Sequence, residues 1–208
     1  MIEMLFQTTV KDLLSCQDML KFTTFVYNFR IVTIVVTTEQ LSIHDKFYIK
    51  DDIVKIPIWL AKLYYKNNHC IIQEFEDIEN VLNSIYSNQQ ISTKNLVPVE
   101  QDFYLLVNDY FNFYIKYRLK YLEINDTLSD NEKTEKEMEI RLNVNKHKSK
   151  FKQLVDKRKK LLLLNSYLGY NRSLIKDMSF EECILYNHIC DAMKNFNDNF
   201  SYEFNENT

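Results

Sequence analysis

The chain has 208 residues, a formal net charge of -3 at pH 7 and a hydrophobic fraction of 46%. This length allows one large domain or two small ones, and the apolar fraction is sufficient for a packed core. The single glycine excludes phosphate-binding loops, which need several glycines so that backbone amides can approach the anion, and no apolar run is long enough to cross a bilayer.

The first third of the chain, residues 1–72, is predicted to form a small β-rich domain. The expected elements are a helix over 4–20, strands over 22–29, 31–38 and 70–72, an extended segment over 46–56 and a short helix over 58–65. β-Branched and aromatic runs of strand length support the strands. Pro57 suits the first turn of the short helix, where its missing N–H would have no partner.

The rest of the chain, residues 73–198, is predicted to form a helical domain with long helices. The expected helices cover 76–87 and 101–122, then a long segment that follows a charged hinge at 129–132 and ends near Leu168, then a final segment after Ser179. The whole chain is therefore expected to be α+β and predominantly helical, with a charged insert near 123–145 and a loose acidic tail over 199–208.

Three local signals fix the predicted boundaries in the last third of the chain. Gly169 fits the left-handed position just after a helix end, where the absence of a Cβ removes the steric cost. Ser179 and Glu182 have the spacing of a capping box that starts the final helix. Met178 and Cys183 stand at the positions of a hydrophobic staple around that cap.

The sequence contains no pattern typical of a catalytic or metal site. No secretory signal is recognisable, so we expect an intracellular protein with reduced thiols. Cys16, Cys70, Cys183 and Cys190 show no metal-binding spacing, and Cys183, Cys190 and His188 supply too few ligands for a tetrahedral site. No nucleophile and base can be paired by spacing. We expect no enzyme activity, no cofactor and no metal.

Two aromatic features allow either a core or an interface. Trp59 and Leu60 are expected to seal the core of the β-rich domain, with Lys62 and Tyr65 on a face open to a neighbouring chain. Repeated tyrosine over 101–122 could serve a core but favours a subunit interface, since each ring has a polar hydroxyl. The candidate interface residues are Phe103, Tyr104, Val107, Tyr110, Phe111, Tyr114, Tyr117, Tyr121, Met178, Phe180 and Ile184.

A basic run over 146–160 also has two interpretations. Its cationic residues are Lys146, Lys148, Lys150, Lys152, Lys157, Arg158, Lys159 and Lys160. Most such runs form a solvated helix face, and the alternative is contact with nucleic acid or a nuclear-import signal. The acidic stretch over 123–139 could lie antiparallel to this run across the hinge at 129–132 and neutralise it.

The order of these motifs resembles that of subunits of the GINS complex, a four-subunit assembly of eukaryotic replication forks. The residues that match a V/L-P-L-W-L-A motif of that family are Ile56, Pro57, Ile58, Trp59, Leu60 and Ala61. Asn28 and Phe29 match its I-x-P-N-F segment, with Tyr27 in place of the proline. FYLLVNDYF and LIKDMSFEECI resemble two further helical segments of the second Psf-type subunit, and the third Psf-type subunit is the alternative.

This resemblance implies a scaffold subunit without bond chemistry. The implied partners are three other GINS subunits, the MCM helicase motor and its second cofactor protein, with indirect or weak DNA contact and no membrane. The implied role is to form the replicative DNA helicase in the nucleus, during initiation and elongation of chromosomal replication. A nucleic-acid-binding module that uses residues 146–160 is the alternative function.

Overall fold

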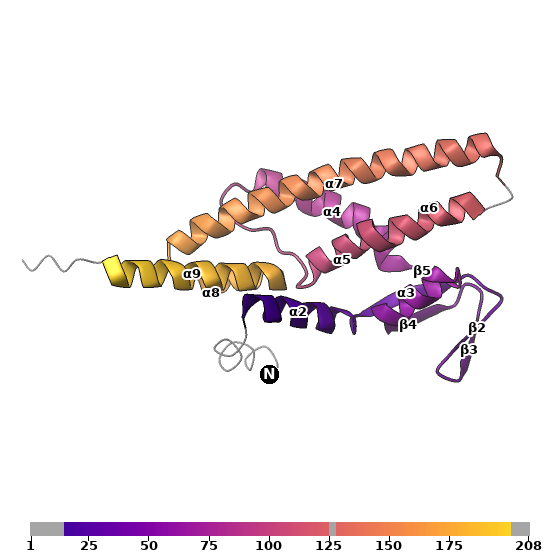
Figure 1. The fold of residues 1–208 in the computed structure, drawn as a ribbon, viewed down its shortest axis with the longest axis horizontal. Helices are drawn as coiled ribbons and strands as arrows, with labels where there is room; N and C mark the ends of the chain where they lie inside the picture. The colour runs from indigo at the N-terminus through magenta and orange to yellow at the C-terminus, as the bar shows by residue number, and fades with distance from the viewer. Residues whose placement is uncertain (1–14, 125–127, 201–208) are drawn as a thin grey trace, which may run out of the picture.

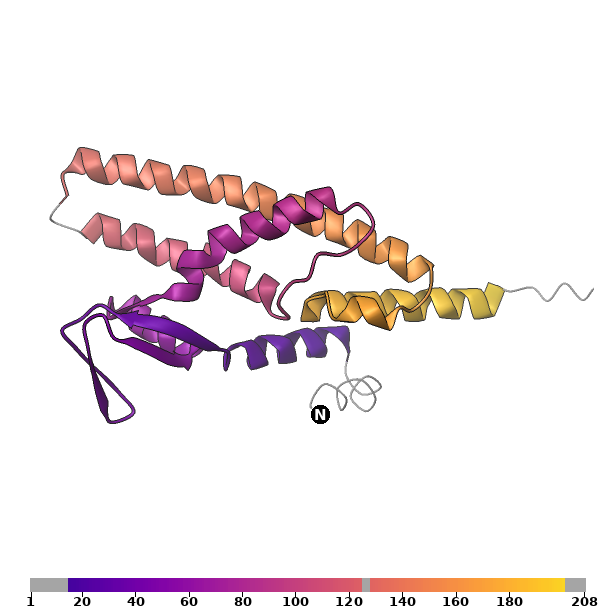
Figure 2. The same cartoon turned by 180° about the vertical axis from the view of Figure 1, so that it is seen from behind.

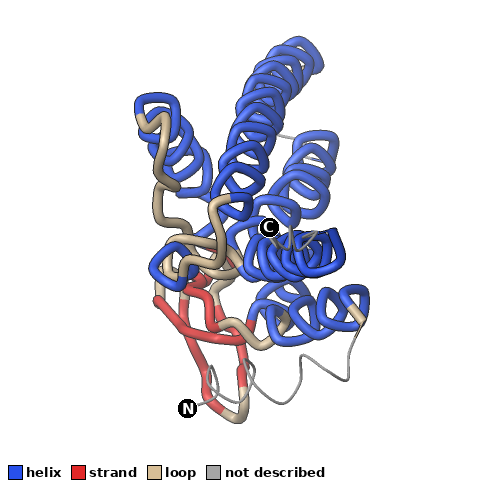
Figure 3. Tube along the Cα trace, turned by 90° about the vertical axis from the view of Figure 1, so that its left-hand side faces the viewer, coloured by secondary structure: helices blue, strands red, loops and turns tan. Residues whose placement is uncertain are grey.

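The computed structural model of the chain describes residues 15–124 and 128–200. A small antiparallel sheet lies at one side of a set of long helices, as Figures 1 and 3 show. The elements of the first third are α2 (Cys16–Tyr27), β1 (Ile31–Val36), β2 (Gln40–Ile43), β3 (Lys46–Ile49), β4 (Ile53–Pro57), α3 (Ile58–Lys66) and β5 (Cys70–Ile72). The expected fold class, α+β and predominantly helical, is confirmed.

The main sheet has three strands in the order β4-β1-β5, and both pairs are antiparallel. Val32, Ile34 and Val36 of β1 are buried at alternate positions, as the pleat of a strand requires. Past the end of β5, the Glu74 carboxylate accepts the Thr33 N–H at 2.8 and 3.0 Å and so continues the hydrogen bonding along β1. β2 and β3 form a separate hairpin.

The strand predicted over 22–29 is wrong, because its residues up to Tyr27 belong to helix α2. The Ser15 side chain caps this helix by accepting the Asp18 N–H at 3.2 Å. Thr23 and Tyr27, four residues apart, are buried, which is a helical rather than a strand period. Of the helix predicted over 4–20, residues 4–14 lie outside the described part.

The strand predicted over 31–38 is confirmed by β1, and the short strand over 70–72 by β5. The extended segment predicted over 46–56 is in fact two strands, β3 and β4, separated by a turn in which Asp51 has a φ of 71°. Strand β2 was not expected. It pairs with β3 through a tight turn in which His44 and Asp45 both have positive φ.

The helical part consists of α4 (Gln73–Ile91), α5 (Phe103–Asp109), a π-helical turn η1 (Tyr110–Tyr114), α6 (Ile115–Ile124), α7 (Asp130–Tyr167), α8 (Arg172–Ile175) and α9 (Phe180–Phe200). The predicted capping box of the last helix is confirmed: the Glu182 N–H donates to Ser179 Oγ at 3.3 Å, and the Ser179 N–H donates to Glu182 Oε2 at 3.1 Å. Gly169 follows α7 with a φ of 99°, as expected. A second capping box, Ser129 with Glu132, starts α7.

Helix α7 is continuous over 38 residues and contains residues 130–139 of the acidic stretch together with the whole basic run. The expectation that these segments lie antiparallel to each other is therefore wrong, because they follow each other along one helix; Ser129 caps this helix and residues 130–132 form its first turn. The antiparallel neighbour of its first half is α6, as Figures 1 and 2 show. Residues 130–145 of the predicted insert are thus helical.

The sheet and the helices share one hydrophobic core. A single buried cluster runs from Ile34 of the sheet through Phe75 and Val107 to Leu154 of α7. A smaller cluster under the end of α7 includes Leu162, Met178 and Tyr186, with Cys183 packed against it. β5 ends at Ile72 and α4 begins at the next residue, so no linker separates the two predicted regions.

Candidate interaction surface

The two segments that carry the family resemblance in the first third of the chain lie against each other. The Ile58 N–H donates to the Arg30 carbonyl at 2.8 Å, and the Trp59 N–H donates to the Asn28 carbonyl at 3.4 Å. Ile31 pairs with Pro57 across β1 and β4. The segment 28–31 thus leads into β1 directly beside the start of α3.

Helix α3 buries one side of the tryptophan motif and exposes the other. Ile58, Ala61 and Tyr65 are buried and follow a helical period, and Leu60 and Ile56 are buried beside them. Trp59 is 47% exposed and Leu63, four residues later, is 50% exposed. The expectation that Trp59 seals the core is therefore wrong.

The polar face predicted for α3 is also corrected by the structure. Tyr65 is buried and stacks on Tyr114 with ring centroids 5.1 Å apart. Lys62 forms an ion pair with Asp109, and its ammonium group lies 5.4 Å from the centre of the Tyr27 ring. Both residues thus bind inside the chain, and the face open to a partner is that of Trp59 and Leu63.

Aromatic residues of α2 and of the segment just after it extend the exposed apolar surface. The rings of Phe22, Phe25 and Phe29 follow one another with centroid distances of 6.4 and 5.1 Å. Phe25 and Phe29 are each more than half exposed. We call the following residues the α2–α3 surface: Phe22, Phe25, Val26, Phe29, Ile31, Trp59 and Leu63, all of which are exposed.

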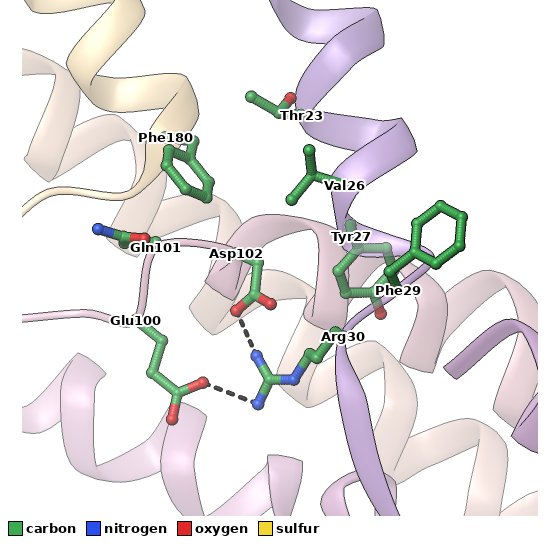
Figure 4. Close-up of a pocket in the computed structure, with 9 residues that line it drawn as sticks. All are labelled: Thr23, Val26, Tyr27, Phe29, Arg30, Glu100, Gln101, Asp102 and Phe180. Atoms are coloured by element: carbon green, nitrogen blue, oxygen red, sulfur yellow. Dashed lines mark hydrogen bonds and ion pairs between the residues drawn. The ribbon is translucent and has the colours of Figure 1, made fainter. Parts of the chain in front are cut away.

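A hollow of about 510 Å³ adjoins this surface between α2 and the start of α9. Figure 4 shows Val26 and Phe180 on opposite sides of it, with Arg30 at its floor. Arg30 binds Glu100 at 2.9 Å and also pairs with Asp102. Burial lowers the pKa of this guanidinium, but the two carboxylates outweigh that effect and raise it. The Arg30 charge is thus fully paired within the chain, and the rest of the lining is mainly apolar.

The aromatic stripe over 101–122 lies mostly in the chain's own core. Phe103, Val107, Tyr110 and Tyr114 are buried, and Met178 is buried in the smaller cluster. The interface expected for them is therefore wrong. Tyr104, Phe111, Tyr117 and Tyr121 are partly buried against the same core, and Phe180 and Ile184 are half-buried.

The tyrosine hydroxyls explain why this stripe can be internal. Tyr110 donates to the Glu79 carboxylate, and Tyr114 donates to that of Glu76, both on α4. Tyr121 donates to the backbone carbonyl of Tyr65. A buried phenol that has an acceptor within the same chain does not need a partner protein.

Arg158 is fully buried, which excludes for this residue both the solvated helix face and the alternative of phosphate contact. Its guanidinium binds Glu182 through Nε–Oε1 at 2.7 Å and Nη2–Oε2 at 2.8 Å. It also donates to the Gln89 side chain and to the carbonyls of Val97 and Asp177. Glu182 therefore caps α9 and holds α7 at the same time. The cap was predictable from spacing, whereas the ion pair was not.

Of the other lysines in the basic run, two form hydrogen bonds within the chain and five are exposed to solvent. Lys150 donates to Asn83 Oδ1 at 2.7 Å, and Lys157 donates to the Gln90 carbonyl at 2.9 Å. The remaining lysines are exposed on α7, namely Lys146, Lys148, Lys152, Lys159 and Lys160. Lys148, Lys152 and Lys159 are spaced by four and seven residues and share one side of the helix, whereas Lys146 and Lys160 lie toward another side.

Three features of the described residues concern metal binding, thiol reactivity and membrane spanning. Within residues 15–124 and 128–200, no group of three or more His, Cys, Asp and Glu side chains could hold a metal ion. Burial raises the pKa of the Cys70 and Cys183 thiols to about 12, which leaves them protonated and unreactive at neutral pH. No helix in this part of the chain is long and apolar enough to cross a membrane.

Comparison with known proteins does not place this chain in a family. No family model matches the sequence, and no curated protein matches it.

Proposed function

We propose that this chain is a non-catalytic scaffold subunit of a GINS-type heterotetramer, most similar to its second Psf-type subunit. The observation that carries the proposal is the contact between segment 28–31 and the tryptophan motif, with Phe29, Trp59 and Leu63 exposed beside it. Large apolar side chains exposed together favour a protein-interaction surface. Exposed Trp and Phe are also the residue types that contribute most at such surfaces.

A second exposed apolar region supports a role with several partners. At the end of α7 and just after it, five large apolar side chains are more than half exposed: Leu163, Leu164, Tyr167, Leu168 and Tyr170. This region lies at the C-terminal end of α7, which is the end away from α6. The α2–α3 surface lies instead around the start of the sheet (Figure 1). A subunit with two separate interaction regions can contact two different chains.

In this proposal the chain joins three sister subunits, and the assembly joins the MCM motor and its second cofactor to form the replicative DNA helicase in the nucleus. DNA contact is indirect or weak. The chain stabilises the assembly and performs no bond chemistry.

Affinity purification of the full-length chain from its own cells, followed by mass spectrometry, tests this function. We expect three proteins of similar size in equal amounts, with MCM subunits in smaller amounts. Recovery of a stable, monodisperse monomer without such partners would contradict the proposal.

A surface variant makes the same test specific. Trp59→Ala with Leu63→Ala should leave the far-ultraviolet circular dichroism unchanged, since both side chains are about half exposed, and should reduce recovery of the partners. Lys66→Ala, an exposed change on the same helix, is the matched control and should retain them. If the unchanged chain, the double variant and the control variant all recover the partners equally, the α2–α3 surface is not part of the interface.

A further inference from the structure

A basic groove between α6 and α7 is unrelated to the surfaces described above. It has a volume of about 740 Å³ and includes Lys116, Lys120, Arg141 and Lys148 among its lining residues. Among the lining residues that the structure describes, Glu123 is the single carboxylate. Four cations against one anion, in a chain of net charge -3, concentrate positive potential at this place.

Three of these cations are not neutralised by a carboxylate of the described residues. Arg141 is held by Glu137 at 2.7 Å on the same helix. Lys116, Lys120 and Lys148, in contrast, form no ion pair with any residue in 15–124 or 128–200. The Lys148 ammonium lies 5.6 Å from the centre of the Phe111 ring, which places it over the groove wall.

The apolar residues that line the groove bear on whether its anionic ligand is a nucleic acid or an acidic peptide. Leu119 is half-buried, and Ile115 and Val144 are buried beneath the groove. The rings of Phe111 and Tyr117 also line it, but Lys148 lies over the first and Lys66 lies 5.9 Å from the centre of the second. Nucleic acid on such a surface would need free ring faces for its bases. Aliphatic side chains between cations suit a peptide better.

The start of α7 limits how far a polyanion could extend. Its first ten residues contain five carboxylates, namely Asp130, Glu132, Glu135, Glu137 and Glu139. A long phosphate backbone leaving the groove in that direction would meet this negative segment, whereas a short anionic segment would not. Charge and lining together favour a short acidic peptide.

We propose that the α6–α7 groove binds an acidic segment of a partner protein. Its Asp and Glu side chains pair with Lys116, Lys120 and Lys148, and its apolar side chains cover Leu119. The inference does not depend on the identity of the proposed complex, because it uses only the charge and lining of this groove.

Fluorescence anisotropy with a labelled peptide in which Asp and Glu alternate with Leu and Phe tests the proposal. The full-length chain is used, together with any subunits that purify with it. Lys116→Glu, Lys120→Glu and Lys148→Glu together should weaken binding at least about tenfold, since each reversal replaces an attraction by a repulsion. The control variant reverses Lys152, Lys159 and Lys160, which are exposed on α7 outside the groove, and should remain within about twofold of the unchanged protein.

Three results would overturn the proposal: no binding of the peptide, equal weakening by both triple variants, or tighter binding of a single-stranded oligonucleotide of the same net charge at the same site. A second peptide, with Ser in place of Leu and Phe, should bind more weakly than the first. Equal affinity for both peptides would show that charge alone acts and would refute the role of the apolar lining.

Discussion

The buried ion pair between Arg158 and Glu182 makes the sharpest prediction about stability. Arg158→Met keeps much of the apolar side-chain volume but removes every guanidinium hydrogen bond, including both bonds to Glu182 at 2.7 and 2.8 Å. The Glu182 carboxylate then remains buried without its counter-charge. Removing one partner of a buried pair costs about 3–5 kcal/mol, a large part of the stability of a typical domain.

Urea unfolding of the full-length chain, followed by circular dichroism, measures this loss. The adjacent exposed change Lys159→Met is the control and should alter the free energy of unfolding by less than about 0.5 kcal/mol. Adding Glu182→Gln to Arg158→Met should restore part of the loss, because the neutral amide can still accept the Ser179 N–H. A loss below about 1 kcal/mol for Arg158→Met, or a double variant less stable than the single one, would refute the reasoning.

Three further changes test other parts of the fold by the same unfolding measurement. Burial raises the pKa of Glu76 above its usual 4.5, so the ionised form is disfavoured in the folded chain. The unchanged protein should therefore gain stability relative to Glu76→Gln as the pH falls from about 7 toward about 5, and a difference independent of pH would contradict this. Gly169→Ala should cost about 1–2 kcal/mol through backbone strain alone, since φ is 99° and no atom lies within 4 Å of the added Cβ; an unchanged midpoint would contradict this. Ser129→Ala should cost about 1 kcal/mol by removing the cap of α7, whereas Thr134→Ala within the same helix serves as the control, and equal losses would argue against the cap.

Local signals in the sequence were sufficient for several elements. Ser179 and Glu182 have fixed spacing and contact each other within one turn, so the cap could be predicted without knowing the fold. Gly169 needs only the helix that precedes it. The β-branched run at 31–36 forms a central strand, where such residues pack well.

Features that depend on distant residues could not be predicted. The run at 22–27 has strand-like composition, but the cap of α2 and its contact with α9 favour a helix. Figure 2 shows α2 beside α9. The tyrosines at 110 and 114 are internal because Glu79 and Glu76, more than thirty residues earlier, accept their hydroxyls. Nothing in the spacing of the basic run distinguishes Arg158 from its exposed neighbours. The outward direction of Trp59 likewise depends on which side of α3 meets the sheet.

The direct passage from β5 into α4 limits how the molecule can move. Because the sheet and helices α4 to α7 bury apolar side chains in one shared cluster, neither part can swing without opening that cluster. Trp59 on α3 and Leu168 after α7 are therefore kept at a constant separation. Two proteins that bind at these residues would therefore be held at a fixed distance from each other. Any hinge motion between them would have to come from the bound proteins themselves.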